Sequence, residues 1–359
     1  MPKSLTGRLV DGEIKKPKRQ LAMVFDLNKC LGCHTCAIAC KTQWTRDEGQ
    51  ENMWWTLVNT LPGQGSPRGG EKTGGGFDAP AGEARPGTIP RAADYGEAME
   101  FNHDEVFRGG KGQAVHFHPH TASGKPPAWS ANWDEDAGAG EYPNSYYFYM
   151  PRICNHCTRP ACLEACPRNA IRKRDKDGIV LINEKSCKGY RFCVAACPYK
   201  RIYFNPLHDV SQKCIFCFPR VEKGVAPACV RQCPGRMRFF GYLDDENGPV
   251  HRLVEKWQVA LPLHAEYNTQ PNVYYVPPLS PPRLDEQGNV TDEPRIPLAY
   301  LRSLFGPRVD EVLATLKHEM DRKARGEKSE LLDALIVYRW SDDLFPGFGK
   351  DPITLERAR

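Results

Sequence analysis

Cysteine thiols are the side chains whose spacing most clearly predicts chemistry in this 359-residue sequence. There are 15 cysteines, an odd number, and residues 1–20 are charged throughout without an apolar leader segment. These features argue against the disulfide framework of a small secreted domain, so we expect thiolate ligands for metal instead. The cysteines form four groups: Cys30, Cys33, Cys36 and Cys40; Cys154, Cys157, Cys162 and Cys166; Cys187, Cys193 and Cys197; and Cys214, Cys217, Cys229 and Cys233.

The first group has the spacing C-x2-C-x2-C-x3-C, which binds iron–sulfur clusters in bacterial ferredoxins. In such a run, three cysteines wrap one cluster, and the fourth lies about one helical turn (~5.4 Å) further along and reaches another. Proline follows Cys166, Cys197 and Cys233 and redirects the chain out of the ligand helix, whereas Lys41 follows Cys40. Zinc is the alternative, but zinc sites use two separated pairs of cysteines rather than a triplet with a displaced fourth member.

If the fourth cysteine of each group binds the cluster of the group with which it pairs, the pairing of the groups predicts which thiols share a cluster. Residues 170–186, AIRKRDKDGIVLINEKS, join groups two and three and predict two strands with an Asp-Gly turn between them. Groups one and four then pair by elimination, and the strand-like segments 21–27 and 238–245 that flank them could form one sheet. We therefore expect three 4Fe–4S clusters and one smaller site: Cys30, Cys33, Cys36 and Cys233; Cys40, Cys214, Cys217 and Cys229; Cys154, Cys157, Cys162 and Cys197; and Cys166, Cys187 and Cys193.

Tyr190 stands where the rhythm of the third group, CKGYRFCVAACP, would place a fourth cysteine. A phenol with a pKa near ~10 is a poor substitute for a thiolate, so we expect one iron to be absent and the cluster to be 3Fe–4S. Two alternatives remain: a 4Fe cluster with water on its open iron, and a site without a cluster. Loss of one iron and one thiolate generally raises the reduction potential.

The elements that position these thiols predict an α+β fold with two nested, pseudo-twofold bacterial-ferredoxin-like modules. The expected domains are residues 1–58 with 207–248 for the outer module, 146–206 for the inner module, a Gly/Pro-rich insertion at 59–145 and a C-terminal extension at 249–359. Within the insertion, HFHPH places three histidines on alternate positions, which we interpret as surface or hydrogen-bonded residues rather than metal ligands. The extension contains an extended proline-rich arm and helical stretches near 307–324 and 329–338.

Composition excludes several classes of function. The net charge of +5 and the pI of about 8.4 are too small to indicate nucleic-acid binding by themselves, and no apolar stretch approaches the ~20 residues of a membrane helix. Basic residues crowd the cysteine groups, where they could offset anionic clusters or serve as ordinary surface charges. They are Lys41, Arg159, Arg168, Lys188, Arg191, Lys200, Lys213, Arg220, Arg231 and Arg236.

Several longer stretches carry a resemblance to a known family. They are LNKCLGCHTCAIACKTQWT, YYFYMPRICNHC, DGIVLINEKSCKGYRFCVAACPYKRIYFNP, KCIFC, GYLDD and NVYYVPP. The sequence resembles the β subunits of the soluble three-subunit molybdenum enzymes of the dimethyl sulfoxide reductase family. Ethylbenzene, steroid and dimethylsulfide dehydrogenases and selenate and chlorate reductases are members, with the nitrate reductase β subunit a more distant relative.

The resemblance implies an electron-transfer subunit without a catalytic centre of its own. Its partners would be an α subunit with molybdenum bis-guanine dinucleotide and a γ subunit with haem b, with the cluster pair of groups one and four facing α and the 3Fe–4S cluster at the haem end. The resemblance also implies a periplasmic location, reached by export in the folded state with an α subunit that bears a twin-arginine signal; a cytoplasmic location is the alternative. We expect a dehydrogenase or hydroxylase complex, with an oxyanion reductase or a self-contained iron–sulfur enzyme as alternatives.

Overall fold

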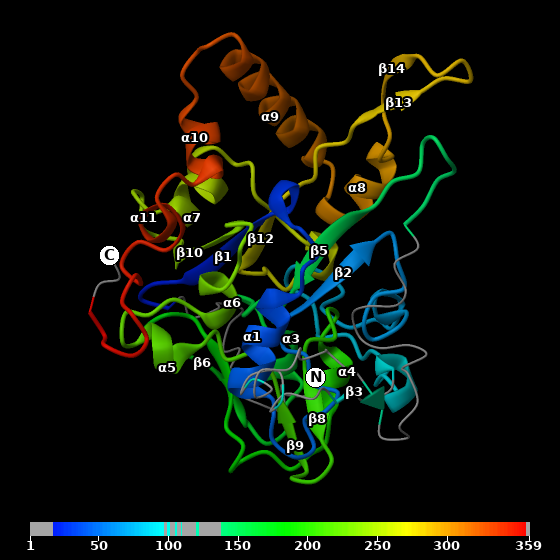
Figure 1. Cartoon of the computed structure of the whole chain (residues 1–359). Helices are drawn as coiled ribbons and strands as arrows, with labels where there is room; N and C mark the ends of the chain where they lie inside the picture. Colours follow the sequence, from blue (N-terminus) through cyan, green and yellow to red (C-terminus); the bar gives the residue numbers. More distant parts are fainter. Residues whose placement is uncertain are drawn as a thin grey trace.

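A four-stranded sheet lies at the centre of the computed structural model, which describes residues 17–96, 99–100, 105, 109, 120–121 and 138–356. Its strand order is β10-β1-β12-β11, and β1 is therefore an inner strand (Figure 1). All six residues of β1 are buried, as expected for an apolar strand that is covered on both faces. The strands are β1 (Leu21–Asp26), β10 (Arg238–Tyr242), β11 (Leu261–Pro262) and β12 (Val273–Val276).

The antiparallel pairing of β1 with β10 confirms that the segments flanking groups one and four form one sheet. In this register, Leu21 lies opposite Tyr242 and Phe25 lies opposite Arg238. Strand β12, by contrast, comes from the region expected to be an extension, and it pairs in parallel with β1. The C-terminal region thus completes the central sheet as well as extending beyond it.

Short helices carry many of the cysteines. Helix α1 packs against α6, and α3 packs against α4, so each contact joins two cysteine groups. Their bounds, with that of α5, are α1 (Thr35–Trp44), α3 (Ala161–Glu164), α4 (Phe192–Ala196), α5 (Phe218–Val221) and α6 (Ala228–Arg231).

Two hairpins surround the third cysteine group. Strands β6 (Ile171–Lys173) and β7 (Val180–Ile182) pair antiparallel, which confirms the strand, turn and strand predicted between groups two and three. Gly178 in that turn has φ +72°, a conformation that L-residues with a Cβ rarely adopt. Strands β8 (Tyr203–Asn205) and β9 (Val210–Gln212) form the second hairpin.

The insertion leaves and re-enters the core at one place, because β2 (Leu57–Leu61) pairs antiparallel with β5 (Phe148–Arg152). Its described part is mostly irregular, with one short strand pair, β3 (Met99–Glu100) and β4 (His120–Thr121). The Gly76 amide donates to the Ala196 carbonyl at 2.9 Å, which fastens the insertion to the end of α4. Of the alternating histidines, His116 and His118 lie outside the described residues, and only the backbone of His120 is described.

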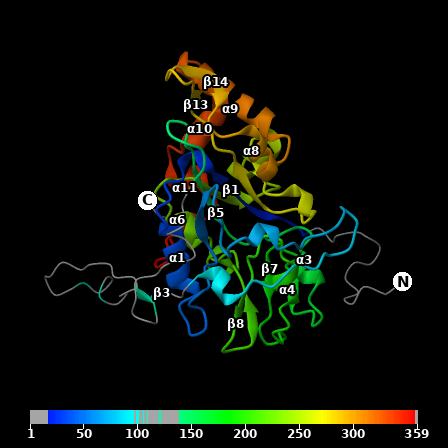
Figure 2. The same ribbon diagram turned by 90° about the vertical axis from the view of Figure 1, so that its right-hand side faces the viewer.

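The C-terminal region forms a helical layer and a projecting hairpin. Figures 1 and 2 show that this hairpin, β13–β14, and helix α9 lie at the end of the molecule opposite β8. Helices α9 and α10 confirm the two predicted helical stretches, and no helix in the described ranges is long and apolar enough to cross a membrane. The elements are α7 (Pro249–His251), a π-helical turn (Arg252–Lys256), β13 (Pro282–Leu284), β14 (Val290–Pro294), α8 (Leu298–Phe305), α9 (Val309–Ala324), α10 (Glu330–Ile336) and α11 (Trp340–Leu344).

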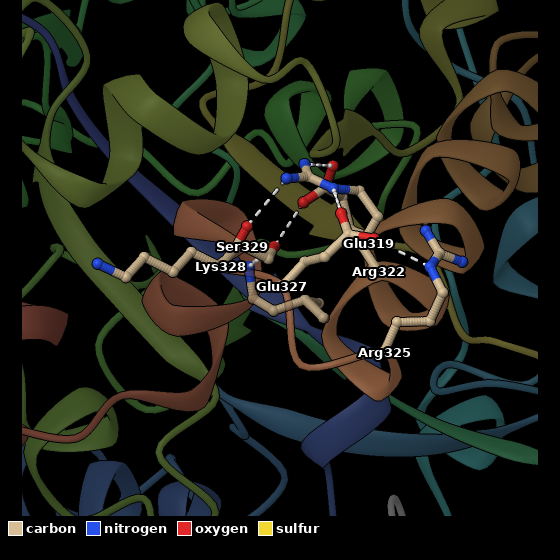
Figure 3. Close-up of polar contacts among 7 residues, drawn as sticks. Glu319, Arg322, Arg325, Glu327, Lys328 and Ser329 are labelled. Atoms are coloured by element: carbon tan, nitrogen blue, oxygen red, sulfur yellow. Dashed lines mark hydrogen bonds and ion pairs between the residues drawn. The ribbon is translucent and has the colours of Figure 1, made fainter.

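Arg322 fixes the turn between α9 and α10 (Figure 3). Its guanidinium contacts Glu319 and Glu327, each at 2.9 Å, and donates to the Lys328 carbonyl at 3.0 Å. Ser329 then caps α10 by accepting from the Leu332 amide at 3.2 Å. These contacts orient α10, whose Leu335 carbonyl accepts from a lysine next to the first cysteine group.

Candidate iron–sulfur centres

The first predicted set of thiols lines one cavity with about 300 Å³ of empty space. Cys30 and Cys33 come from the loop before α1, Cys36 comes from the first turn of α1, and Cys233 follows α6. Arg238 at the start of β10 lines the same cavity. The pairing of β1 with β10 brings the two ends of this set together across the sequence.

A second cavity, with about 370 Å³ of empty space, is lined by Cys154, Cys157, Cys162 and Cys197. These are the four thiols of another predicted set, contributed by the loop before α3, by α3 itself and by the end of α4. The His156 ring stacks on Phe216 with centroids 4.4 Å apart, so this loop packs against the loop of the fourth group.

The predicted set that includes Cys40 is brought together around the α1–α6 contact. Cys40, Cys214, Cys217 and Cys229 are all buried. Burial raises the pKa of Cys40 well above its ordinary value, and the nearby thiols of the other three members raise it further. Cys40 therefore lies near thiols of the fourth group, as expected for a cysteine that follows the other ligands of its own group by one helical turn.

The remaining three thiols, Cys166, Cys187 and Cys193, also lie together. Burial raises the pKa of Cys193 to about 11, with Cys166 and Cys187 as neighbouring thiols that act in the same direction. The Cys187 sulfur accepts from the Ser211 amide, and the Cys166 sulfur accepts from the Ala170 amide, both at 3.4 Å. All 15 cysteines are thus placed in the groupings expected from the sequence, while their assignment to particular clusters stays a prediction.

Tyr190 occupies a loop with the same backbone turns as the loop of the first group. Gly32 and Gly189 both have φ +64°, and the residues two positions later, His34 and Arg191, have φ +54° and +59°. Tyr190 therefore takes the backbone position that Cys33 takes in the first loop. Its side chain is 56% exposed and offers a phenol in place of a thiol.

The effects of thiols on one another's pKa indicate which sets are neighbours. Besides burial, which is the larger cause, Cys229 of the set around the α1–α6 contact raises the pKa of Cys36 in the first cavity, and Cys154 of the second cavity raises the pKa of Cys214. The second cavity and the set that includes Cys193 share helices α3 and α4. The four sets therefore form a continuous series, from the first cavity through the α1–α6 set and the second cavity to the set beside Tyr190.

The chemistry of the donors fits iron–sulfur clusters. Burial raises the pKa values of Cys36, Cys157 and Cys217 to about 12, so these thiols need a strong positive charge before they lose their protons. Donors that favour thiolate are already in place, such as the Trp44 indole N–H, which donates to Cys217 Sγ at 3.2 Å. Bound iron would supply the charge, and N–H donors of this kind would tune the potential of a cluster.

The spacing of the side chains also bears on the zinc alternative. Among the residues that the structure describes, no three Cys, His, Asp or Glu side chains converge closely enough to hold a single metal ion. A 4Fe–4S cluster takes one thiolate on each of its four irons, from thiols spread around a cavity, whereas a single zinc ion draws its ligands to about 2.3 Å. Each of the two cavities is lined by four thiols around about 370 and 300 Å³ of empty space.

Many of the basic residues noted in the sequence donate hydrogen bonds to main-chain carbonyls. Lys41 Nζ donates to the carbonyls of Gln50, Glu51 and Met53 at 2.5, 3.0 and 3.3 Å. Lys200 Nζ donates to Ala195 O at 2.7 Å. Lys213, Arg159 and Arg236 likewise donate to carbonyls. These contacts brace the loops around the thiols, and they explain why lysine rather than proline follows Cys40.

Arg238 is a candidate functional residue that the sequence interpretation missed. It was grouped with a strand, RFFGYLDD, although its side chain is fully buried and donates to Cys36 Sγ at 2.9 Å. The available signal was a charged residue that opens an otherwise apolar strand five positions after a cysteine.

Comparisons with known proteins agree with this chemistry. Residues 145–243, which span cysteine groups two to four, match the family model described as a 4Fe-4S dicluster domain. The chain is 56% identical over 322 residues to the dimethylsulfide dehydrogenase subunit beta of Rhodovulum sulfidophilum, which covers 90% of this chain and 97% of that protein.

Two further relatives are reductase subunits. The selenate reductase subunit beta of Thauera selenatis is 54% identical, with 90% of this chain and 98% of that protein covered. The respiratory nitrate reductase subunit beta of Haloferax mediterranei is also 54% identical, with 88% and 90% covered. The expectation that nitrate reductase β subunits are more distant is therefore wrong for this last protein.

Proposed function

Because the chain belongs to the family of iron–sulfur β subunits of dimethylsulfide dehydrogenase and of selenate, chlorate, perchlorate and nitrate reductases, it is an electron-transfer subunit that binds 4Fe–4S clusters, and we propose that it carries four clusters in series. Three are 4Fe–4S clusters and the fourth, beside Tyr190, is 3Fe–4S. The observation that carries this proposal is the pair of cavities, each lined by four thiols from remote segments.

The proposed ligand sets are those expected from the sequence. The cavity linings support the sets completed by Cys233 and Cys197, and the mutual effects of thiols on pKa support the other two. The matching backbone turns of the first and third loops, and the helix pairs α1–α6 and α3–α4, support two nested modules related by a pseudo-twofold axis.

The chain's own residues would hold the clusters, exclude water from them and set their potentials. Bound clusters supply one-electron carriers, and their series order provides a route from one end of the subunit to the other. We propose that a molybdenum bis-guanine dinucleotide α subunit contacts the end near Cys33, and that a haem b γ subunit contacts the end near Tyr190. Both residues are exposed, so a cluster beside either of them would lie near the surface, where a partner's redox centre can approach it.

We propose further that the complex is a dehydrogenase or hydroxylase and that it acts in the periplasm after folded export with its α subunit. The relative with 56% identity, a dehydrogenase subunit, supports the first point. Loading of reduced thiols in the cytoplasm before export to an oxidising compartment is the physical reason for the second.

The decisive experiment removes single ligands from the anaerobically purified complex and follows iron, acid-labile sulfide and EPR signals. Cys36→Ala and Cys233→Ala should abolish the same cluster signal, because the two residues share a set. Cys229→Ala, only four residues from Cys233, should abolish a different one. The crossed arrangement is wrong if Cys233→Ala and Cys229→Ala remove the same signal and Cys36→Ala another.

A self-contained enzyme is distinguished by assaying the isolated chain. The electron-transfer assignment expects it to exchange electrons with dyes but to turn over no substrate without its α subunit. Turnover by the chain alone would instead favour chemistry at the open corner beside Tyr190.

A further inference from the structure

Arg238 is a fully buried cation at the first position of β10. The register places it opposite Phe25 on β1, and its guanidinium lies over the Phe25 ring at 4.5 Å from the centroid. Nη2 donates to Cys36 Sγ at 2.9 Å, whereas Nε and Nη1 are buried without a hydrogen-bond partner among the described residues. Two of its donor nitrogens therefore lack an acceptor among the described residues.

Other buried cations in this core donate to main-chain oxygen atoms. Lys41, Lys200 and Lys213 all donate to main-chain carbonyls. Arg201 also donates to a carbonyl, that of Tyr199 at 3.1 Å, although its Nη1 is buried without a hydrogen-bond partner among the described residues. Arg238 is distinct because its hydrogen bond goes to sulfur, and within the described ranges no carboxylate lies within ion-pair distance of it.

A buried guanidinium without an anion is strongly unfavourable, because its charge has lost hydration and gained no counter-charge. The charged partners that the site can offer are sulfurs. Cys30, Cys36 and Cys233 line the same cavity as Arg238, and Cys36 Sγ accepts its hydrogen bond. These sulfurs become anionic when they bind iron.

We propose that Arg238 is the internal counter-cation of the cluster held by Cys30, Cys33, Cys36 and Cys233, and that it raises the reduction potential of that cluster. The inference rests on the proposed function, since it requires a cluster at this site. Reduction adds one negative charge to the cluster, and a fixed cation in a water-poor site stabilises the reduced form more than the oxidised form. Nε–H and Nη1–H are then available to donate to cluster or ligand sulfur.

The test is an EPR-monitored redox titration of the purified complex that carries Arg238→Met. Methionine keeps an unbranched apolar side chain and removes the charge, so the midpoint potential of one cluster should fall while the others move little. Arg238→Lys keeps the charge and should shift the same potential less than Arg238→Met does. Arg302→Met is the control, because Arg302 on α8 is exposed and forms an ion pair with Asp310 at 2.8 Å; it should leave all potentials close to wild type.

A second measurement does not depend on how well a variant assembles. In the wild-type complex labelled with ¹⁵N-arginine, the reduced cluster should show magnetic coupling to a guanidinium nitrogen by pulsed EPR. The inference is overturned if this coupling is absent, or if Arg238→Met retains every cluster with unchanged potentials. Absence of iron and sulfide from the wild-type complex would instead overturn the proposed function.

Discussion

The Trp44 indole offers a quantitative test of how this chain tunes a cluster. Trp44 ends α1, one turn after Cys40, and its Nε1–H donates to Cys217 Sγ at 3.2 Å. Trp44→Phe keeps an aromatic side chain in a half-buried position and removes only the polar donor. The variant should therefore lower the potential of the cluster bound by Cys40 and Cys217, because an N–H donor stabilises the more negative, reduced state.

The size of the effect follows from the type of bond. A hydrogen bond to a charged group contributes about 1.5–3 kcal/mol. An added electron spreads over the whole cluster, so we assign about one third of this, roughly 0.5–1 kcal/mol, to the difference between redox states. Since ~59 mV corresponds to a tenfold change in a one-electron equilibrium, the potential should fall by about 20–45 mV.

The assay is an EPR-monitored redox titration of the wild-type and Trp44→Phe complexes under the same anaerobic conditions. Trp257→Phe serves as the control, because that ring lies against Arg252 and Lys256 rather than against sulfur. A potential that is unchanged or higher in Trp44→Phe, with full iron content, would refute the reasoning. So would an equal shift in Trp257→Phe.

Three further predictions concern the vacant corner, acid stability and the core. Tyr190→Cys should replace the 3Fe–4S EPR signal by a 4Fe–4S signal of lower potential; a persistent 3Fe–4S signal would contradict the assignment. Hydrogen bonds from Lys176 and Arg174 lower the pKa of Glu222. The stability that Glu222→Gln removes should therefore be present above pH 4.5 and should vanish as the pH falls through the lowered pKa. Thermal unfolding at several pH values measures this dependence. Phe240→Ala empties a fully buried position on β10 and should cost about 3–5 kcal/mol in denaturant unfolding; a cost below ~1 kcal/mol would mean that the ring is not part of a packed core.

Local patterns in the sequence predicted the parts of this fold that depend on short-range spacing. The β6–β7 hairpin follows from the short apolar segments on either side of Asp177-Gly178, and the grouping of thiols follows from the ferredoxin-type run. The pairing of β1 with β10 could also be predicted, because two apolar segments flank cysteine groups that must meet.

Long-range packing was less accessible. The parallel pairing of β12 with β1 joins segments whose own patterns carry no information about the partner strand. Lys41 seemed a small departure from the Cys-Pro rule, but the distant carbonyls that it binds show why α1 continues to Trp44. Arg238 was missed for a similar reason, because burial of a guanidinium beside sulfur is visible only after the two sheet edges have been brought together.

The inner position of β1 has a consequence for the order of synthesis. This strand is synthesised more than 200 residues before both of its neighbours, β10 and β12. A nascent polypeptide that stops before Val276 can supply the loop with Cys30, Cys33 and Cys36 but not the finished sheet on which that loop rests. Maturation of the first centre must therefore wait until β12 has been made, and translation products that end before Val276 should lack this centre.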